Sequence, residues 1–422
     1  MHYNPERVRL GGVLSPPYDV IGSEEQEALY GRNLRNVVRI ELGREFTDDV
    51  PGERDRYTRA RDHLESWLKL GVLVRDPAPA YYVTSHEFEL PTGGTATRRG
   101  VFGTVASMPW DRSLLVPHER TLNAPKQDRL TLLRATGVQT SPVFALAADS
   151  DGLESLLDRV TSGPALLGGR TEGELGPEKH LLWRCDSADV VRATASALAT
   201  ARFYVADGHH RYETMAAYAA EVRSRLGRDP ADADVAPTLV YAVAAADPTL
   251  LILPTHRLVR PAHGVAFSLD DLWARLDDAF ELERTPDLPA AVARAGEMRA
   301  SHHAFAAVAR DGAAVLSRVR RDAPSPRAAL DVVVLEDEVL APAGVGEQAV
   351  AAGALVYTRS ADDLDGAVRG GEAVLGFAVN PVSVAQVIAV SDASEVMPQK
   401  STYFYPKVAT GLVLNPVLPM AE

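Results

Sequence analysis

The chain has 422 residues, of which 46% are hydrophobic and 24% are charged, a composition typical of globular proteins and not of disordered or fibrous ones. A formal net charge of -13 argues against a nucleic-acid-binding face over much of the surface. The single cysteine, Cys185, excludes disulfides within the chain and argues against a cysteine-based metal site.

The length predicts two or three domains, because one ordinary hydrophobic core does not extend over so many residues. No apolar run approaches the roughly 20 residues that a membrane-spanning helix needs. The first residues also lack a basic region followed by an apolar one. We therefore expect a cytoplasmic protein without a membrane partner.

The first hundred residues predict an alternation of helices and strands. Two prolines favour an extended segment over residues 13–20, and a helix is expected to begin at Ser23. Residues 36–42 alternate as in a strand. Residues 53–70 carry apolar side chains at three- and four-residue spacing and predict an amphipathic helix. Residues 80–105 predict a β-hairpin.

Two polar loops in the first part of the chain are candidate site elements. Tyr18 and Asp19 follow the proline pair, and they belong either to a rigid surface turn or to a loop that places them at a site. His118 and Glu119 follow a strand-like run that ends in a proline, and the alternative there is a solvated loop. Residues 126–134 then predict a charged helix.

The most informative stretch reads as a buried strand, a tight polar turn and a helix start. Residues 203–206 are a short run of strand formers, and residues 212–221 have high helix propensity without a breaker. The turn between them consists of Asp207, Gly208, His209, His210 and Arg211. Gly208 permits a sharp turn, and free N–H groups at a helix N-terminus attract anions. With an arginine and two imidazoles, the turn predicts a phosphate site.

The remainder of the chain predicts a second domain and a motif-like tail. Residues 261–370 alternate helix and strand, although residues 328–335 fit either. The tail carries hydroxyl and ammonium groups between prolines that disfavour regular helix. These groups belong to Lys400, Ser401, Thr402 and Lys407. The tail is either a docked terminal segment with solvated lysines or a segment that adds positive charge to the site.

Four of these motifs carry a family resemblance. Residues 15–20, 117–119, 206–211 and 397–407 occur in an order that resembles the domain of unknown function 1015 family. The resemblance spans nearly the whole chain. The name of that family implies no activity.

The Asp207–Arg211 turn carries a second resemblance. It is similar to the phosphate-binding motif of the ParB/sulfiredoxin-like fold, and within that fold to the free L-serine kinases. The resemblance implies a mixed α/β (α+β) protein. Residues 1–260 would form a ParB/sulfiredoxin-like core with an N-terminal extension, residues 261–370 a second α+β domain, and residues 371–422 a segment that returns to the core. Glu119 resembles the catalytic glutamate that those kinases carry on an earlier loop.

These residues are chemically sufficient for phosphoryl transfer. Gly208, His209 and Arg211 would hold the phosphates together with Lys400, Ser401, Thr402 and Lys407, while Tyr18, Asp19 and His118 would line a substrate loop. Glu119, Asp207 and His210 are the candidate catalytic groups, with a carboxylate as the base. A nucleotide, ATP or ADP, with Mg²⁺ is the expected cofactor, and a small hydroxyl metabolite such as free serine is the expected substrate.

Other functions stay open at this point. A transition metal on Asp207, His209 and His210 is disfavoured, because adjacent residues rarely bind one ion and the spacing matches no common zinc pattern. No Gly-rich loop followed by Lys-Ser/Thr occurs, which disfavours a P-loop enzyme. A phosphatase or nuclease could use the same anion site, and a nucleotide-binding module could act without turnover. We rank the kinase first, the hydrolase second and the binding module third.

Overall fold

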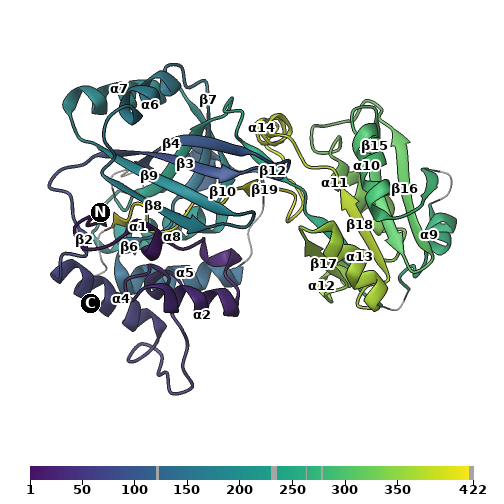
Figure 1. Ribbon diagram of the computed structural model, residues 1–422, viewed down its shortest axis with the longest axis horizontal. Coiled ribbons are helices and arrows are strands. Elements are labelled where there is room, and N and C mark those ends of the chain that lie inside the picture. Colours follow the sequence, from purple (N-terminus) through teal and green to yellow (C-terminus); the bar gives the residue numbers. More distant parts are fainter. Residues whose placement is uncertain (120–122, 230–234, 263, 277–278, 418–422) are drawn as a thin grey trace. The chain divides into compact units, whose positions relative to one another are not determined.

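The computed structural model describes residues 1–119, 123–229, 235–262, 264–276 and 279–417 (Figure 1). The chain divides into two compact units. Unit 1 comprises Met1–Pro117, Thr121–Leu250 and Pro406–Glu422, and unit 2 comprises His118–Arg120 and Leu251–Tyr405. Both units combine helices with sheet, so the predicted mixed α/β class is confirmed.

Unit 1 is built on a mixed eight-stranded sheet in the order β5-β10-β7-β11-β4-β3-β9-β8. Its strands are β3 (Tyr81–Glu89), β4 (Thr95–Val105), β5 (Leu115–Val116), β7 (Val143–Ala148), β8 (Leu167–Glu172), β9 (Pro177–Cys185), β10 (Arg202–Asp207) and β11 (Thr238–Ala244). β3 and β4 form the predicted hairpin. β10 lies between the parallel strand β5 and the antiparallel strand β7, so the end of β10 is placed by neighbours on both sides.

Unit 1 also contains several helices. They are α1 (Leu10–Val13), α2 (Ser23–Arg32), α3 (Val38–Glu41), α4 (Arg56–Lys69), α5 (Asn123–Thr136), α6 (Leu153–Thr161), α7 (Ala188–Leu198) and α8 (His209–Arg225), with the 3₁₀ turns η1 (Tyr18–Val20) and η2 (Trp110–Arg112). Figure 1 shows α6 and α7 on one side of the sheet and α4 and α5 on the other. α4 begins with a capping box between Asp55 and Thr58 and buries Ala60, Leu64 and Trp67, as its spacing predicts.

The last part of the chain runs back through unit 1 beside its beginning. β1 (His2–Tyr3) pairs with β2 (Leu73–Val74), and β6 (Val138–Gln139) pairs with β20 (Asn415–Pro416). Ser15 and Thr410 form an antiparallel bridge. The bridge lies just before the Tyr18–Asp19 loop and just after Lys407, so two motifs that are far apart in sequence are neighbours in unit 1.

Unit 2 contains an antiparallel six-stranded sheet in the order β14-β16-β15-β18-β13-β17. Its strands are β13 (His256–Val259), β14 (Glu281–Thr285), β15 (His302–Ala309), β16 (Gly312–Val319), β17 (Leu355–Thr358) and β18 (Leu375–Val379). A separate pair, β12 (Leu251–Leu253) with β19 (Tyr403–Tyr405), joins the first and last segments of the unit.

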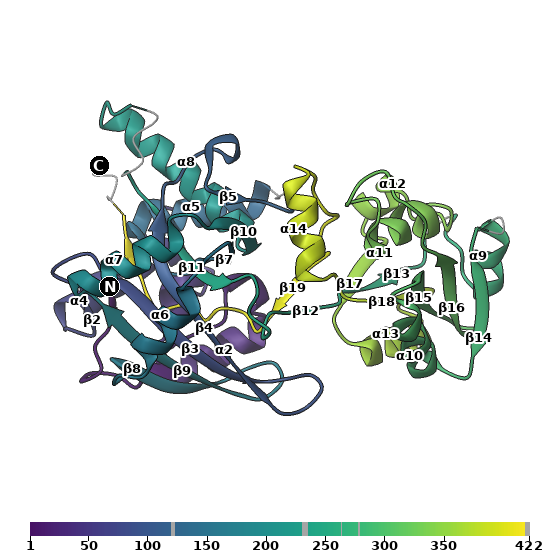
Figure 2. The same cartoon turned by 90° about the horizontal axis from the view of Figure 1, so that it is seen from above.

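Helices pack on both faces of the second sheet (Figure 2). α10 (Leu288–Met298) and α13 (Ala361–Gly370) bury apolar residues on one face. α9 (Leu269–Arg275), α11 (Asp331–Val334) and the π-helix η3 (Leu335–Leu340) do so on the other, and α12 (Glu347–Ala351) and α14 (Val384–Asp392) complete the unit. Among the helices in the described part of the chain, none combines the length and apolar character needed to cross a bilayer.

Two expectations about the fold need correction. Residues 36–42 were expected to be a strand, but α3 is a short helix. The Asn36 side chain accepts a hydrogen bond from the Val38 N–H at 3.0 Å and so begins a turn, which hydrophobic alternation does not reveal. The return to the core was expected from residue 371. The division into units places it at Pro406 instead, because β18 pairs with β13 and β15 inside the second sheet.

Candidate functional site

The polar turn after β10 depends on a glycine. Asp207 is the last residue of β10, and α8 begins at His209. Gly208 between them has a φ of 97°, a left-handed conformation that is costly for other residues. A Cβ atom there would also lie 3.1 Å from the guanidinium carbon of Arg211. The turn therefore brings a strand-end carboxylate to the N-terminus of a 17-residue helix.

Two cations hold the Asp207 carboxylate. The Lys407 ammonium donates to Oδ1 at 2.7 Å, and the Arg211 guanidinium donates to Oδ2. The side chain of Asp207 is 18% exposed, and those of Arg211 and Lys407 are 7% and 12% exposed. Burial acts to raise the pKa of Asp207, but Lys407 and Arg211 outweigh it and hold this pKa well below its usual range. Asp207 is therefore an ionised anchor for two cations.

Arg211 connects the turn with the N-terminal loop. Its guanidinium also donates to the carbonyl of Pro142. Burial acts to lower the pKa of Arg211, but Asp207, followed by Asp19 and Tyr18, raises it overall. The Tyr18 ring lies against the Arg129 guanidinium, with 4.2 Å from the guanidinium carbon to the ring centroid. Unit 1 thus brings the proline-rich loop close to the turn.

Burial is the main influence on the Tyr18 hydroxyl. It raises the pKa of Tyr18 to about 12, and the charge of Asp19 adds to the rise. Tyr18 is consequently neutral at physiological pH and can donate a hydrogen bond.

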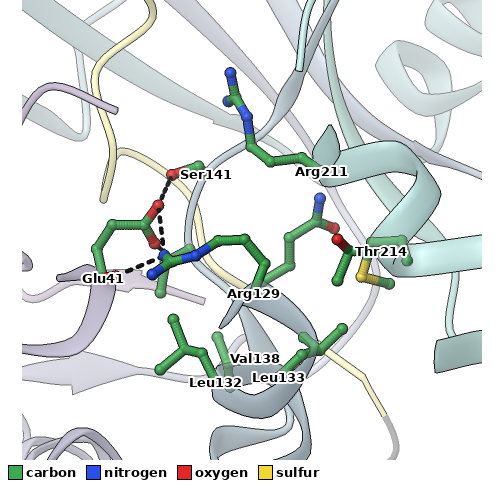
Figure 3. Close-up of a pocket in the computed structure, with 11 residues that line it drawn as sticks. Glu41, Arg129, Leu132, Leu133, Val138, Ser141, Arg211 and Thr214 are labelled. Carbon is green, nitrogen blue, oxygen red and sulfur yellow. Dashed lines mark hydrogen bonds and ion pairs between the residues drawn. The ribbon is translucent and has the colours of Figure 1, made fainter. Parts of the chain in front are cut away.

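A small pocket adjoins this cluster (Figure 3). It is lined by Glu41, Arg129, Ser141, Arg211 and Thr214, with apolar side chains from α5, β6 and α8. Its cavity volume of about 40 Å³ exceeds the roughly 10–15 Å³ that is needed to hold one water molecule. The pocket can therefore hold water but not a nucleotide.

The first turn of α8 is packed by aromatic side chains. His209 is buried, and its ring centroid lies 6.3 Å from that of Trp110. The Trp110 ring also contacts Tyr212, and its N–H donates to Glu213 at 2.9 Å. The backbone carbonyl of His210 accepts from the Thr214 hydroxyl at 2.7 Å. These contacts fix the helix start that presents the two imidazoles.

A second group of motif residues lies in unit 2. Glu119 forms a parallel bridge with Met397, whose N–H donates to the His118 carbonyl at 2.8 Å. The His118 ring is fully buried and its Nε2 lies 3.0 Å from the Thr402 hydroxyl. The charge of Glu119 also contributes to the raised pKa of Tyr357, for which burial is the main cause. The His118–Glu119 loop and the first half of the tail motif are therefore neighbours.

The tail motif is split between the two units. Lys400 has a φ of 58°, and the Ser401 hydroxyl donates to the Pro398 carbonyl at 2.6 Å, which together form a tight turn in unit 2. Lys407 follows the boundary at Pro406 and contacts Asp207 in unit 1. Glu119 belongs to unit 2 and Asp207 to unit 1, so the role of Glu119 as a base at the Asp207 turn remains a prediction.

A buried histidine at the start of β13 gives unit 2 a pH-dependent stability. Burial, with Arg257 as a second cause, lowers the pKa of His256 to about 4, against about 6.5 in an unfolded chain. The folded state disfavours the protonated form. The stabilisation is therefore complete above pH 6.5 and is lost as the pH falls toward 4. Between pH 7 and 5.5 we expect the free energy of unfolding to fall by about 1 kcal/mol through His256.

Urea titrations at both pH values would measure this loss, with His256→Gln as the matched variant. The variant should lack this part of the pH dependence. Equal slopes in the two proteins would show that His256 is protonated as easily in the folded state as in the unfolded one.

Sequence reasoning missed several groups that the structure brings together. Glu41 and Arg129 line the pocket beside Arg211, yet neither belongs to a recognisable motif. His86, Glu178 and His180 form a separate buried cluster in unit 1. The available signal was the spacing of Glu178 and His180, since residues two apart in a strand share one face.

Comparisons with known proteins give one family and several distant folds. The family model described as "Protein of unknown function (DUF1015)" matches residues 1–333. No curated protein matches the chain. A conserved hypothetical protein from Pyrococcus furiosus is similar in structure, with 13% identity, a TM-score of 0.36 and coverage of 74% of this chain and 95% of that one.

Two further solved structures have named proteins. A free serine kinase in complex with AMP has 14% identity and a TM-score of 0.37, and the similarity covers 74% of this chain and 92% of that one. SbnI with a C-terminal truncation, from Staphylococcus aureus, has 11% identity and a TM-score of 0.36, with 73% and 85% covered. A structure of a mutant free serine kinase in complex with ADP is also similar.

Proposed function

The chain belongs to the family described as protein of unknown function (DUF1015), and for this member we propose a phosphoryl-transfer activity, that of a nucleotide-dependent kinase of a small hydroxyl metabolite resembling free serine. The proposal rests on the residues of the site. The distant structural similarity is consistent with it but is not its basis.

One observation carries the proposal. Asp207 holds Lys407 and Arg211 together at the N-terminus of α8, so two cations and the positive end of a helix dipole converge on one turn. Phosphoryl transfer consists largely of positioning and of stabilising negative charge on the transferred group. A buried cationic turn of this kind supports phosphate binding, with His209 and the backbone of Gly208 as further donors.

The remaining roles follow from charge. Asp207 is already paired with two cations, so we propose that it orients Lys407 and does not accept the substrate proton. Glu119 is the proposed base for the attacking hydroxyl, and His210 a proposed donor to the phosphate. The proposed phosphate donor is ATP or ADP with Mg²⁺, an ion that commonly binds nucleotide phosphates together with only one or two carboxylates.

The test is a product search with matched variants. The full chain is incubated with ATP or ADP, Mg²⁺ and a pool of hydroxyl metabolites, and phosphorylated products are identified by mass spectrometry. We expect Glu119→Gln to lower the rate roughly 10²- to 10⁴-fold, as loss of a general base does. Glu297→Gln, at an exposed position on α10 of the same unit, should leave the rate unchanged.

The alternatives give different results. Release of inorganic phosphate from phosphoesters without a donor nucleotide would identify a hydrolase. Tight nucleotide binding without any product would identify a binding module and overturn the kinase. Full activity of Glu119→Gln would show that Glu119 is not the base, and it would not contradict the proposed phosphate site.

A further inference from the structure

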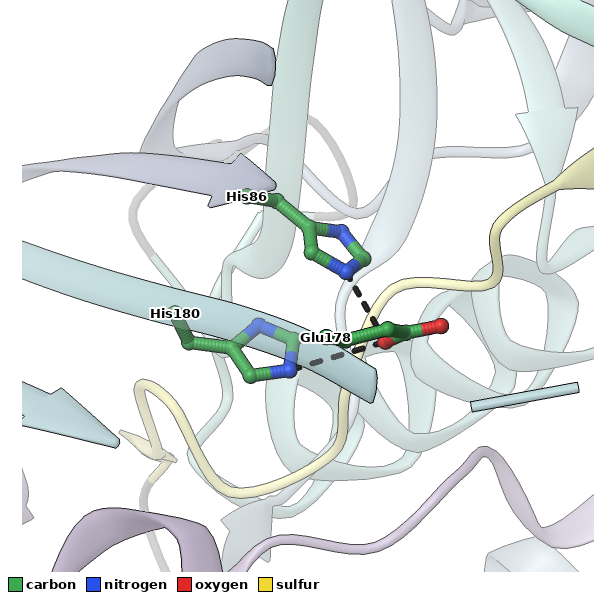
Figure 4. A group of neighbouring side chains, drawn as sticks. All are labelled: His86, Glu178 and His180. Carbon is green, nitrogen blue, oxygen red and sulfur yellow. Dashed lines mark hydrogen bonds and ion pairs between the residues drawn. The ribbon is translucent and has the colours of Figure 1, made fainter. Parts of the chain in front are cut away.

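Three metal-ligating side chains converge on one face of the sheet in unit 1 (Figure 4). His86 comes from β3, and Glu178 and His180 come from β9. All three are buried, and their ligand atoms lie within 4.8 Å of one another. None of them belongs to the motifs that carry the proposed function, so the cluster needs an explanation of its own.

The sheet itself produces this convergence. β3 and β9 are antiparallel, and His86 lies directly opposite His180 in the register. Glu178 is two residues before His180, and alternate residues of a strand point to the same face. The two imidazole centroids are 4.4 Å apart, and the carboxylate lies between their Nε2 atoms in Figure 4. Ordinary strand geometry thus aims two imidazoles and one carboxylate at a common point.

We propose that His86, Glu178 and His180 bind a divalent transition-metal ion, with Zn²⁺ the best match. Two imidazoles and one carboxylate are a recurrent protein ligand set for Zn²⁺. Bonds of about 2.0–2.1 Å in a tetrahedron place the ligand atoms about 3.3 Å apart. The distances from the carboxylate to the two imidazoles bracket that value: Oε2 of Glu178 lies 2.8 Å from Nε2 of His86 and 3.6 Å from Nε2 of His180. Small side-chain shifts therefore suffice to accommodate the ion.

Hydrogen bonding alone does not account for the cluster. His180 Nε2 lies 2.8 Å from the Thr171 hydroxyl, and His86 Nε2 contacts Glu178. Nδ1 of His180 nevertheless stays buried without a hydrogen-bond partner among the described residues. An ion bound at Nε2 would not satisfy this atom, so the unpartnered Nδ1 shows only that the cluster is not a fully satisfied hydrogen-bond network. The Thr171 hydroxyl, from β8, is close enough to serve as a fourth ligand or to hold a bound water.

The surroundings enclose the cluster. A Cβ atom on Gly173, in the turn between β8 and β9, would lie 2.0 Å from Oε1 of Glu178, so the turn packs directly on the carboxylate. Arg98 lies opposite His86 on β4, but its guanidinium donates to the carbonyls of Thr249 and Pro406. Arg98 therefore hydrogen-bonds to backbone carbonyls, while its charge still acts on His86 and Glu178.

The contacts of Arg98 imply a structural role for the bound metal. Pro406 accepts a hydrogen bond from Arg98 at 3.5 Å and immediately precedes Lys407, which contacts Asp207. An ion bound between β3 and β9 would therefore fix β3. The neighbouring strand β4 carries Arg98, which holds the segment before Lys407. The metal would act as a structural clamp of unit 1, and its binding does not depend on the kinase activity.

The experiment measures metal binding by the intact chain. The protein is stripped with a chelator, titrated with Zn²⁺ against a chromophoric competitor, and titrated separately with Co²⁺, whose absorption reports tetrahedral coordination. We expect one ion per chain, and roughly 100-fold or greater weakening in His86→Gln, Glu178→Gln and His180→Gln. His302→Gln, on β15 of unit 2, is the matched control and should bind as the wild type does.

A second measurement decides the matter if the buried variants do not fold. X-ray absorption of the Zn²⁺-loaded wild type should show two imidazole ligands and oxygen ligands, and the melting temperature should fall on chelation. Less than a tenth of an ion per chain, or wild-type affinity in all three folded variants, would overturn the proposal. A spectrum without imidazole ligands would do so as well.

Discussion

Replacing Asp207 by alanine should lower the free energy of unfolding of unit 1 by about 3–5 kcal/mol, because the change leaves two buried cations without their counter-charge. Arg211 would keep the Pro142 carbonyl, and Lys407 would lose the carboxylate that it contacts at 2.7 Å. Urea denaturation followed by tryptophan fluorescence would measure the loss.

The matched control is an exposed ion pair in the same unit. Asp158 pairs with Arg99, and its side chain is 62% exposed. Asp158→Ala should cost no more than about 1 kcal/mol, because water screens such pairs. Equal losses in the two variants would contradict the view that the Asp207 cluster is desolvated.

The double variant Asp207→Ala/Lys407→Met shows which of the two cations causes the loss in the free energy of unfolding. Removing the Lys407 ammonium together with the Asp207 carboxylate should recover about 0.5–3 kcal/mol relative to the sum of the single changes. Purely additive effects would place the loss on Arg211 instead. The same variants also test the proposed phosphate site, in which the cations and not the carboxylate would hold the phosphates.

Local features of the site were readable from the sequence, and its long-range contacts were not. The apolar run before Asp207, the glycine that permits a φ of 97° and the helix formers after it all lie within residues 203–221. The contact between Asp207 and Lys407 joins residues 200 positions apart. No periodicity encodes such a contact, because it depends on how the return segment packs beside the N-terminal loop.

The placement of Glu119 shows the same limit. Its proline-ended strand was visible as a pattern, but its membership of unit 2 follows from a bridge to Met397, 278 residues later in the chain. The His86 cluster was missed for a related reason: Glu178 and His180 share a face locally, whereas His86 reaches them only through the β3–β9 register. Patterns within a strand are local, and pairing between strands is not.

The second large effect is expected at Glu41, the buried acid of the pocket beside Arg211. Glu41 is 3% exposed and accepts from the hydroxyls of Thr140 and Ser141, and it pairs with Arg129 at 3.6 Å. Glu41→Ala would leave both hydroxyls without their acceptor. Arg129 would keep Asp128, with which it also pairs. We therefore expect a loss of about 2–4 kcal/mol in the free energy of unfolding.

Two comparisons separate the causes of that loss. Glu41→Gln retains an acceptor oxygen of the same reach, so it should be clearly less destabilising than Glu41→Ala. Glu27→Ala removes an acid that is 64% exposed and paired with Arg44, and should cost at most about 1 kcal/mol. A full loss in Glu41→Gln would assign the effect to the charge. A loss of stability confined to Glu41→Ala would assign the effect to the two hydroxyls. The Ser141 hydroxyl also contacts that of Thr410 at 2.8 Å and so helps to hold the segment that carries Lys407.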